Sequence, residues 1–413
     1  MKDKIRVAVI GCGGRGRCMA ENVVLFKDVE LVAICDVLEY KMEMMISALK
    51  RAGVDDDKMP RMYSDYKTLF EKEKLDCVQI HTSWATHVDI AVCAMQHGVM
   101  PGLDCGGAYS IDDCWRLVRT SEETGVSCMY LENCCYDRAE MAILRMIKEG
   151  KFGEVVHLQG GYEHDLRWEI SHGTETDHYR FDNYRYRCAD FYPQHALGPL
   201  MKFVNVNRGN RLLSLTSTAS KAVGLHEYIE KQHGTDYFSS KIKFAEGDVV
   251  TTVIKCAGGE TILLTHDTSL PRPYSRGGRV QGTKAIWMED KNAIAFDGDE
   301  EWRPFGEYLN NPEYEHPIWT EIRTDPAKLD AGHGGMDYLV LDAFYDCIRT
   351  NTKPPIDVYD AAVLMAVTAA SEESIAKGSA PVEIPDFTNG KWMKREPAPA
   401  VKYALDGYYP ERY

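Results

Sequence analysis

A tyrosine and a histidine stand three positions apart in the stretch FYPQHALGP, residues 191–199. Both side chains, Tyr192 and His195, can donate and accept protons, and Pro193 between them stiffens the backbone. A phenol and an imidazole held this close can act as a general acid and a general base. The alternative is a buried tyrosine and histidine that only satisfy each other. The chemistry of the pair depends on what the first hundred residues bind.

A glycine-rich turn near the amino terminus has the pattern of a dinucleotide-binding site. A strand-like run at 5–10 leads into GCGGRG and then a helix-compatible stretch, so that Gly11, Gly13 and Gly16 fit G-x-G-x-x-G in the right context. The first glycine permits a tight turn, and the second lets the backbone approach a pyrophosphate at the positive end of the helix. The alternative to dinucleotide binding is a glycine turn in an unrelated α/β domain.

An acidic residue follows at the distance that a ribose-binding carboxylate should have. The second strand-like run, 31–35, ends at Asp36, about 20 residues after the turn. Its charge would repel a 2′-phosphate, so we expect NAD rather than NADP. Arg15, beside the turn, could soften that preference.

A further polar turn follows the next strand, within LDCVQIHTSWATHVDIAVCAMQHGV (75–99). Trp84 lies where a turn after a parallel strand faces the cofactor, although one tryptophan is equally explained by packing. His87 falls just inside the following helix, where a structural role is the better interpretation. Downstream, Ser110 and Asp113 form a capping-box pattern that predicts the start of another helix.

The periodicity changes after about residue 135. A helix is expected over 136–149, followed by strand-like runs with few helices between them, and helical periodicity returns in the tail from Met336 to Ile375. We therefore predict an α/β Rossmann domain (1–134) followed by an α+β domain (135–413) on an open, mostly antiparallel sheet, with the tail helices packing back on the first domain. The predicted strands are 154–162, 248–256, 260–267 and 279–288.

The bulk composition excludes several classes of function. The net charge is −15 over 413 residues, which argues against nucleic acid or an anionic membrane as partner. No apolar run approaches the roughly 20 residues that span a bilayer, and the start MKDKIRVAVIGCGG lacks a signal-peptide pattern. The 13 cysteines are scattered without metal-ligand spacing. We expect a cytoplasmic protein with reduced thiols and no metal site.

Several segments together resemble the glucose-fructose oxidoreductase and inositol dehydrogenase superfamily (Gfo/Idh/MocA). Within it they look most like glycoside hydrolase family 109, the NAD-dependent glycosidases typified by α-N-acetylgalactosaminidases. The resemblance covers nearly the whole chain, and its most specific parts are YEHDLR, YPQHALGP, LPRPYSR with QGTK, GHGGMDY and DVYDAA. It implies cofactor contacts from Gly14, Arg15, Asp36, the Trp84–His87 turn, the Cys105–Gly106 peptide and Asn133. It implies a sugar site lined by Tyr162, Arg180 or Arg185, the Tyr192–His195 turn and Tyr274.

One motif departs from the family pattern. The superfamily usually has Glu-Lys-Pro after the strand ending near residue 104, and family 109 has Glu-Val-Pro, whereas this chain has Cys105-Gly106-Gly107. Loss of the lysine, the usual proton relay of the sugar dehydrogenases, favours the family 109 branch. Cys105 could touch the cofactor or fill space, and we favour filling space.

The resemblance also implies a mechanism. NAD-dependent glycosidases do not use the usual carboxylate pair. Instead, NAD takes a hydride from C3 of the sugar, the resulting ketone acidifies the C2 hydrogen, and the C1 substituent is eliminated. Water then adds, and the hydride returns to C3. His195 would serve the C3 hydroxyl or the leaving group, and Tyr192 the C2 proton, with its pKa of about 10 lowered by cationic neighbours.

Further candidates lie in the connections of the second half. On a strand, Tyr162 and His164 share one face and could point into the site together, while Asp165 and Arg167 on the other face form a structural pair. Tyr274 is better interpreted as a substrate clamp than as a catalyst. His333 is as easily a third site histidine as a helix-entry residue.

Three functions remain open at this point. The first is an NAD-dependent glycosidase, the second an NAD-linked sugar or polyol dehydrogenase that releases its oxidised product. The third is an inactive NAD-binding regulatory protein, which the Cys-Gly-Gly replacement makes conceivable. The expected partner is a small glycoside. An open sheet commonly buries its free face against a second subunit, so we also expect a homo-oligomer, a dimer or tetramer.

Overall fold

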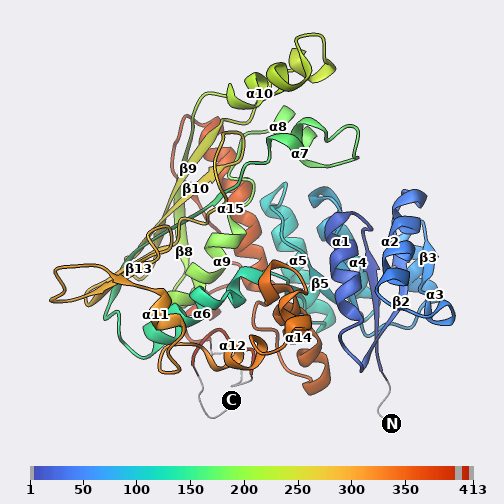
Figure 1. The fold of residues 1–413 in the computed structure, drawn as a ribbon, viewed down its shortest axis with the longest axis horizontal. Helices are drawn as coiled ribbons and strands as arrows, with labels where there is room; N and C mark the ends of the chain where they lie inside the picture. The colour runs from blue at the N-terminus through green and yellow to red at the C-terminus, as the bar shows by residue number, and fades with distance from the viewer. Residues whose placement is uncertain (1–3, 396–401, 409–413) are drawn as a thin grey trace.

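Two β-sheets stand on either side of the long helix α15 (Val358–Ala376) in the computed structural model, which describes residues 4–395 and 402–408 (Figure 1). The helix contacts α5 on one side and strand β8 on the other. The chain ends that we assigned to the two domains, residues 1 and 413, lie outside the described residues.

The first sheet is a six-stranded parallel sheet in the order β3-β2-β1-β4-β5-β6. The chain reverses its direction of progress between β1 and β4, and ligands of such sheets bind at the carboxyl ends of the strands there. The predicted Rossmann fold is confirmed. Its strands are β1 (Ile5–Ile10), β2 (Val29–Cys35), β3 (Arg61–Tyr63), β4 (Cys77–Ile80), β5 (Met100–Leu103) and β6 (Met129–Tyr130).

Helices flank this sheet at the places that the turn and capping residues indicate. Ser110 Oγ accepts a hydrogen bond from the Asp113 amide at 3.1 Å and so caps α5, as the capping-box pattern predicts. The helices are α1 (Gly14–Val23), α2 (Glu39–Arg51), α3 (Tyr66–Lys72), α4 (Trp84–Gln96) and α5 (Ile111–Thr124).

The second sheet has nine strands in the order β14-β13-β12-β11-β7-β10-β9-β8-β15. Its pairs are antiparallel except β7 with β10, so the expected mostly antiparallel sheet is confirmed. The strands are β7 (Val155–Glu163), β8 (Leu212–Ala219), β9 (Val249–Cys256), β10 (Thr261–Asp267), β11 (Arg279–Gly282), β12 (Ala285–Met288), β13 (Ala293–Phe296), β14 (Arg303–Pro304) and β15 (Val382–Glu383).

The predicted strands differ from this sheet in two ways. The run 279–288 is a hairpin of β11 and β12, not one strand, because the chain turns at Thr283 and Lys284, after the last paired residue of β11. Strands β8, β13, β14 and β15 were not predicted. In β8, Ser217 is buried and forms a hydrogen bond with Thr252 of β9 at 2.9 Å.

Helices cover one face of the nine-stranded sheet and return to the first domain. α9 packs on β7 and α15 on β8, while α14 contacts α1 and β1. No helix in residues 4–395 and 402–408 has the length and apolar character needed to cross a membrane. The helices of this half are α6 (Arg138–Lys148), α7 (Arg167–Ser171), α8 (Arg180–Tyr186), α9 (Gln194–Phe203), α10 (Gly224–His233), α11 (Gly306–Leu309), α12 (Pro317–Ile322), α13 (Pro326–Leu329), α14 (Met336–Thr350) and α15.

Candidate active site

The glycine turn between β1 and α1 combines two glycines that packing requires with two that leave open space. Gly11 has a φ of +95°, and a Cβ there would lie 2.5 Å from the His81 backbone. A Cβ on Gly16 would lie 1.8 Å from the Gly11 carbonyl oxygen. At Gly13 and Gly14, by contrast, a Cβ would meet nothing within 4 Å. The turn is therefore closed on its inner side and open outward at the amino terminus of α1, the arrangement that a pyrophosphate needs.

The carboxylate of Asp36 lies at the end of β2 against this turn. Its two oxygens accept hydrogen bonds from the backbone amides of Cys12, at 2.7 Å, and Leu38, at 2.9 Å. An ionised carboxylate has about four acceptor positions, so room remains for ribose hydroxyl groups. The residue is thus held where the sequence spacing places it.

Arg15 belongs to a buried ion-pair cluster under the turn. Its guanidinium lies 2.6 Å from Asp337 and 3.6 Å from Asp104, and Asp337 also bonds to Asn133 Nδ2 and His333 Nδ1, each at 2.8 Å. Burial alone would raise the pKa of Asp337, but Arg15 and His333 hold it well below its usual range. Arg15 is therefore paired with the carboxylate that follows β5 and with one in α14, and the GHGGMDY motif contributes an aspartate that we did not single out beside His333.

Trp84 opens α4 above the peptide after β5. A Cβ on Gly106 would lie 2.2 Å from the Trp84 ring, so the glycine is required by the indole. The Trp84 indole nitrogen is buried without a hydrogen-bond partner among the described residues. His87 lies one turn later, buried, with Nε2 3.0 Å from the Thr82 carbonyl oxygen, and burial lowers its pKa to about 4. This placement fits the structural role that we preferred for His87.

Tyr192 stacks on Trp84 and so joins the second half of the chain to the first. The two ring centroids are 5.9 Å apart, and the Tyr192 ring lies 4.6 Å from Tyr162 and 4.8 Å from His195. The Tyr–Pro–x–His turn therefore does bring its phenol and imidazole together, in a layer of aromatic rings beside the Cys105–Gly106 peptide.

The expectation that cationic neighbours lower the pKa of Tyr192 is wrong. The Arg180 guanidinium lies 5.4 Å from the Tyr192 ring, but burial raises the pKa of the phenol well above its ordinary value, and Cys105 and Asp104 raise it further. Tyr192 is therefore a neutral phenol at physiological pH. It can donate a hydrogen bond, but it is not a resting base.

The structure distinguishes the two candidate arginines. Arg180, 8% exposed, lies over Trp84 and Tyr179 as well as Tyr192 and pairs with Glu169 at 2.5 Å. Arg185, one turn later on α8, is exposed and lies over Tyr186. Only Arg180 joins the aromatic layer.

Tyr162 and His164 meet, but not through strand alternation, because β7 ends at Glu163 and Arg167 already begins α7. Tyr162 Oη lies 3.2 Å from His164 Nδ1, while Asp165 and Arg167 form their own pair at 2.6 Å. Burial raises the pKa of Tyr162 to about 12 and lowers that of His164. The Tyr274 ring, 50% exposed, lies 5.1 Å from the His164 ring, at the outer edge of this group.

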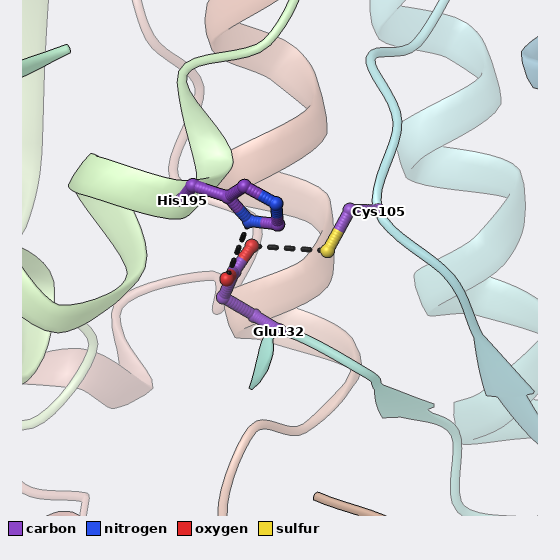
Figure 2. Close-up of side chains that lie close together, drawn as sticks. All are labelled: Cys105, Glu132 and His195. Carbon is purple, nitrogen blue, oxygen red and sulfur yellow. Dashed lines mark hydrogen bonds and ion pairs between the residues drawn. The ribbon is translucent and has the colours of Figure 1, made fainter. Parts of the chain in front are cut away.

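A carboxylate that we did not predict, Glu132, links both halves of the site. Figure 2 shows Cys105 and His195 pointing toward Glu132 from opposite sides: Glu132 Oε1 is 2.8 Å from His195 Nδ1, and Cys105 Sγ donates to Oε2 at 3.0 Å. Cys105 therefore does more than fill space. The signal for Glu132 was its position two residues after β6, at the carboxyl edge of the parallel sheet, where sites of this fold lie.

Two parts of the chain match known families. Residues 5–131 match the family described as "Oxidoreductase family, NAD-binding Rossmann fold", and residues 136–394 match "Glycosyl hydrolase 109, C-terminal domain".

Similar proteins agree with these matches. A glycosyl hydrolase family 109 protein of Stenotrophomonas maltophilia (strain K279a) is 40% identical, covering 98% of this chain and 93% of its own length. An alpha-N-acetylgalactosaminidase of Tannerella forsythia is also 40% identical, with coverages of 96% and 89%. The WlbA dehydrogenase of Bordetella pertussis, solved with NADH and UDP-GlcNAcA, has the same fold at 16% identity, a TM-score of 0.64 and coverages of 93% and 99%. The resemblance predicted from the motifs is confirmed: the chain belongs to glycosyl hydrolase family 109, a family of glycoside hydrolases, with an NAD-binding Rossmann domain.

Proposed function

We propose that the protein is an NAD-dependent glycosidase that cleaves glycosides, with N-acetylgalactosaminides as the first substrates to test. The observation that carries the proposal is the stacking of Tyr192 on Trp84. This contact places the Tyr192–His195 turn, the candidate for proton transfer, against the turn that follows β4. The name of the Tannerella forsythia relative supports the choice of substrate.

The residues around the glycine turn fit the cofactor. Gly13 and Gly14 would admit the pyrophosphate, Asp36 would bind the ribose, and Trp84 with the Cys105–Gly106 peptide would flank the nicotinamide. Gly11, Gly16, Arg15, His87 and Asn133 would act indirectly, by shaping the turns and the ion-pair cluster beneath them. When bound, NAD supplies a hydride acceptor for C3 of the sugar and later a hydride donor to the same carbon.

His195 would move the proton of the C3 hydroxyl. Its Nδ1 is held by Glu132, so Nε2 can take the proton as the C3–H bond breaks and can later donate a proton to the departing oxygen at C1. The imidazolium formed in between would be stabilised by the buried carboxylate.

The phenols would act differently from each other. Tyr192, kept neutral by burial, would donate a hydrogen bond to the C3 oxygen and stabilise the negative charge that develops there when the C2 proton leaves. The C2 proton would pass to Tyr162, whose hydroxyl proton can move to His164 Nδ1. The C1–O bond then breaks, and water adds across C1 and C2. Arg180 and Tyr274 would hold the sugar.

A chromogenic glycoside assay with catalytic NAD tests this function. We expect release of the leaving group without net NADH, because the hydride returns to the product. Stoichiometric NADH would instead indicate a sugar or polyol dehydrogenase, and NAD binding with neither signal would indicate a regulatory protein.

The elimination step has its own signature. In heavy water the product sugar should carry deuterium at C2, because that proton leaves and is replaced from solvent, while C3 keeps its hydrogen. Product with no deuterium at C2 would contradict the mechanism even in an active glycosidase.

The open sheet supports the expected homo-oligomer. Val253 of β9, 45% exposed, is paired with Leu263 of β10 on the face opposite α9 and α15. We propose that this face is buried in a dimer or tetramer, which light scattering in solution would detect.

We also keep the domain division at 134/135 as a proposal. A cytoplasmic location is a further proposal, which the 13 free cysteines support.

A further inference from the structure

Three donors converge on the carboxylate of Glu132. Oε1 accepts from His195 Nδ1 at 2.8 Å and from the Cys134 amide at 2.9 Å, and Oε2 accepts from Cys105 Sγ at 3.0 Å. Glu132 is 0% exposed, so these positions are shielded from bulk solvent. The Cys105, Glu132 and His195 side chains come from three different elements: the loop after β5, the segment after β6, and the first turn of α9 (Figure 2).

The charges of the group determine which atoms carry protons. Burial alone would raise the pKa of Glu132, but His195 and the Cys105 thiol hold it below its ordinary value. Burial and the neighbouring Glu132 raise the pKa of the Cys105 thiol well above normal. An ionised carboxylate only accepts hydrogen bonds, so the thiol and His195 Nδ1 must both donate.

The packing of α9 enforces this contact. A Cβ on Gly198 would lie 2.7 Å from Glu132 Cγ, so a glycine is needed for the helix to approach the carboxylate. On the other side, a Cβ on Gly160 of β7 would lie 2.7 Å from Ala196 Cβ. His195 is three residues before Gly198, on the same side of α9. The glycine of HALGP therefore seats the helix so that its histidine reaches Glu132.

We propose that Glu132 is a positioning residue that holds neutral His195 in its Nδ1–H tautomer, leaving the Nε2 lone pair as the proton acceptor of the site, with Cys105 as the donor that fixes the second carboxylate oxygen. The kinetic consequence rests on the proposed function, whereas the tautomer itself does not. The proposal assigns the unusual Cys105 a role: a protonated thiol beside the carboxylate that orients the base.

The same three side chains could instead bind a metal ion. Their ligand atoms lie within 4.8 Å of one another, and they form a cysteine, glutamate and histidine set of the kind that binds zinc. A metal would require a thiolate and an unprotonated imidazole nitrogen, whereas here each of these atoms is bonded to the carboxylate. Metal analysis of the purified protein therefore separates the two assignments.

Histidine-selective ¹⁵N labelling tests the tautomer directly in the full-length protein. His195 is assigned by the loss of its signals in His195→Gln. We expect the neutral ring to carry its proton on Nδ1 in the wild type. In Glu132→Gln the amide can present an N–H to the ring, so the Nε2–H form should appear. A wild-type Nε2–H ring, an unchanged tautomer in Glu132→Gln, or one equivalent of zinc lost in Cys105→Ser would each overturn the proposal.

Steady-state kinetics gives the second readout. Glu132→Gln should lower kcat about 10²- to 10³-fold, within the range for lost acid–base assistance, with NAD affinity close to wild type. Cys105→Ala should lower kcat about 3- to 10-fold, the worth of one hydrogen bond, and Cys105→Ser, which keeps a donor, should recover part of that loss. Glu315→Gln, at another buried carboxylate that pairs with Arg138 and Arg323, controls for structural damage.

The two levels of failure are distinguishable. If the wild type cleaves no glycoside, the proposed function fails while the NMR result still decides the tautomer. If the wild type is active and Glu132→Gln keeps its kcat, the positioning role is wrong even though the glycosidase is real.

Discussion

The proposed cofactor side takes its pyrophosphate and ribose contacts from residues 11–36, whereas the proposed sugar side gathers Glu132, Tyr162, Arg180 and Tyr192 from four separate segments. On the cofactor side each role follows from a local requirement, such as a positive φ at Gly11 or an open position at Gly13. On the sugar side the roles follow from burial and from partners far away in the chain. The first region can be understood from short-range geometry, and the second only from the assembled fold.

The largest expected effect falls on the sugar side. Tyr192→Phe and His195→Ala should each lower kcat by about 10²- to 10⁴-fold, because each removes a group that donates or accepts a proton or hydrogen bond at the reacting carbons. NAD affinity and melting temperature should remain near wild type. If activity falls only in proportion to thermal stability, the two residues are structural, and the contrast between the two sides of the site fails.

The next effect falls on the junction of the two regions. Asp337→Asn leaves the Arg15 guanidinium with Asp104 alone, so the free energy of unfolding should fall by about 2–3 kcal/mol, near the low end for breaking a buried ion pair. Urea unfolding at pH 7 measures this loss.

The pH dependence of that loss has a definite sign. Because the pKa of Asp337 is lowered in the folded protein, its stabilisation is present above the unfolded pKa of about 4 and fades as the pH falls below it. The variant lacks this carboxylate, so the difference from wild type should narrow from pH 7 toward pH 3. A constant difference would show that the ion pair is not its source.

A change on the cofactor side should alter selectivity more than rate. Asp36→Arg replaces the ribose-binding carboxylate with a partner for a 2′-phosphate, so the ratio of NADP to NAD affinity should rise by about tenfold or more. Titration of both nucleotides, followed by tryptophan fluorescence, measures the ratio. An unchanged ratio of the two affinities would mean that Asp36 accepts hydrogen bonds from the Cys12 and Leu38 amides but does not bind the ribose.

The smallest expected effect concerns the two arginines of α8, Arg180 and Arg185. Arg180→Met should raise KM by about tenfold, as expected for one charge-assisted contact, whereas Arg185→Met should leave kcat and KM unchanged. The two variants remove the same charge from the same helix. Equal effects would contradict the placement of Arg180 alone among the aromatic rings.

Much of the fold was predictable because its signals are local. The strand at residues 5–10, the glycine turn and the cap at Ser110 were all predicted correctly from spacing. The hairpin at 279–288 was missed because only two residues, Thr283 and Lys284, separate its strands. Strand β8 was missed because its polar residues bond to β9, which no short window can show.

The sequence by itself determined the Rossmann turn, the family, and the pairing of Tyr192 with His195, since each depends on residues within a few positions or on recurring motifs. Only the tertiary structure decided that Glu132, 63 residues before His195, would orient that histidine, and that Asp337, 322 residues after Arg15, would neutralise it. It also decided the protonation state of Tyr192, because the pKa of the phenol depends on burial and on charges brought close by folding. Residues this far apart in the chain meet only when the chain folds, so the sequence does not show such contacts.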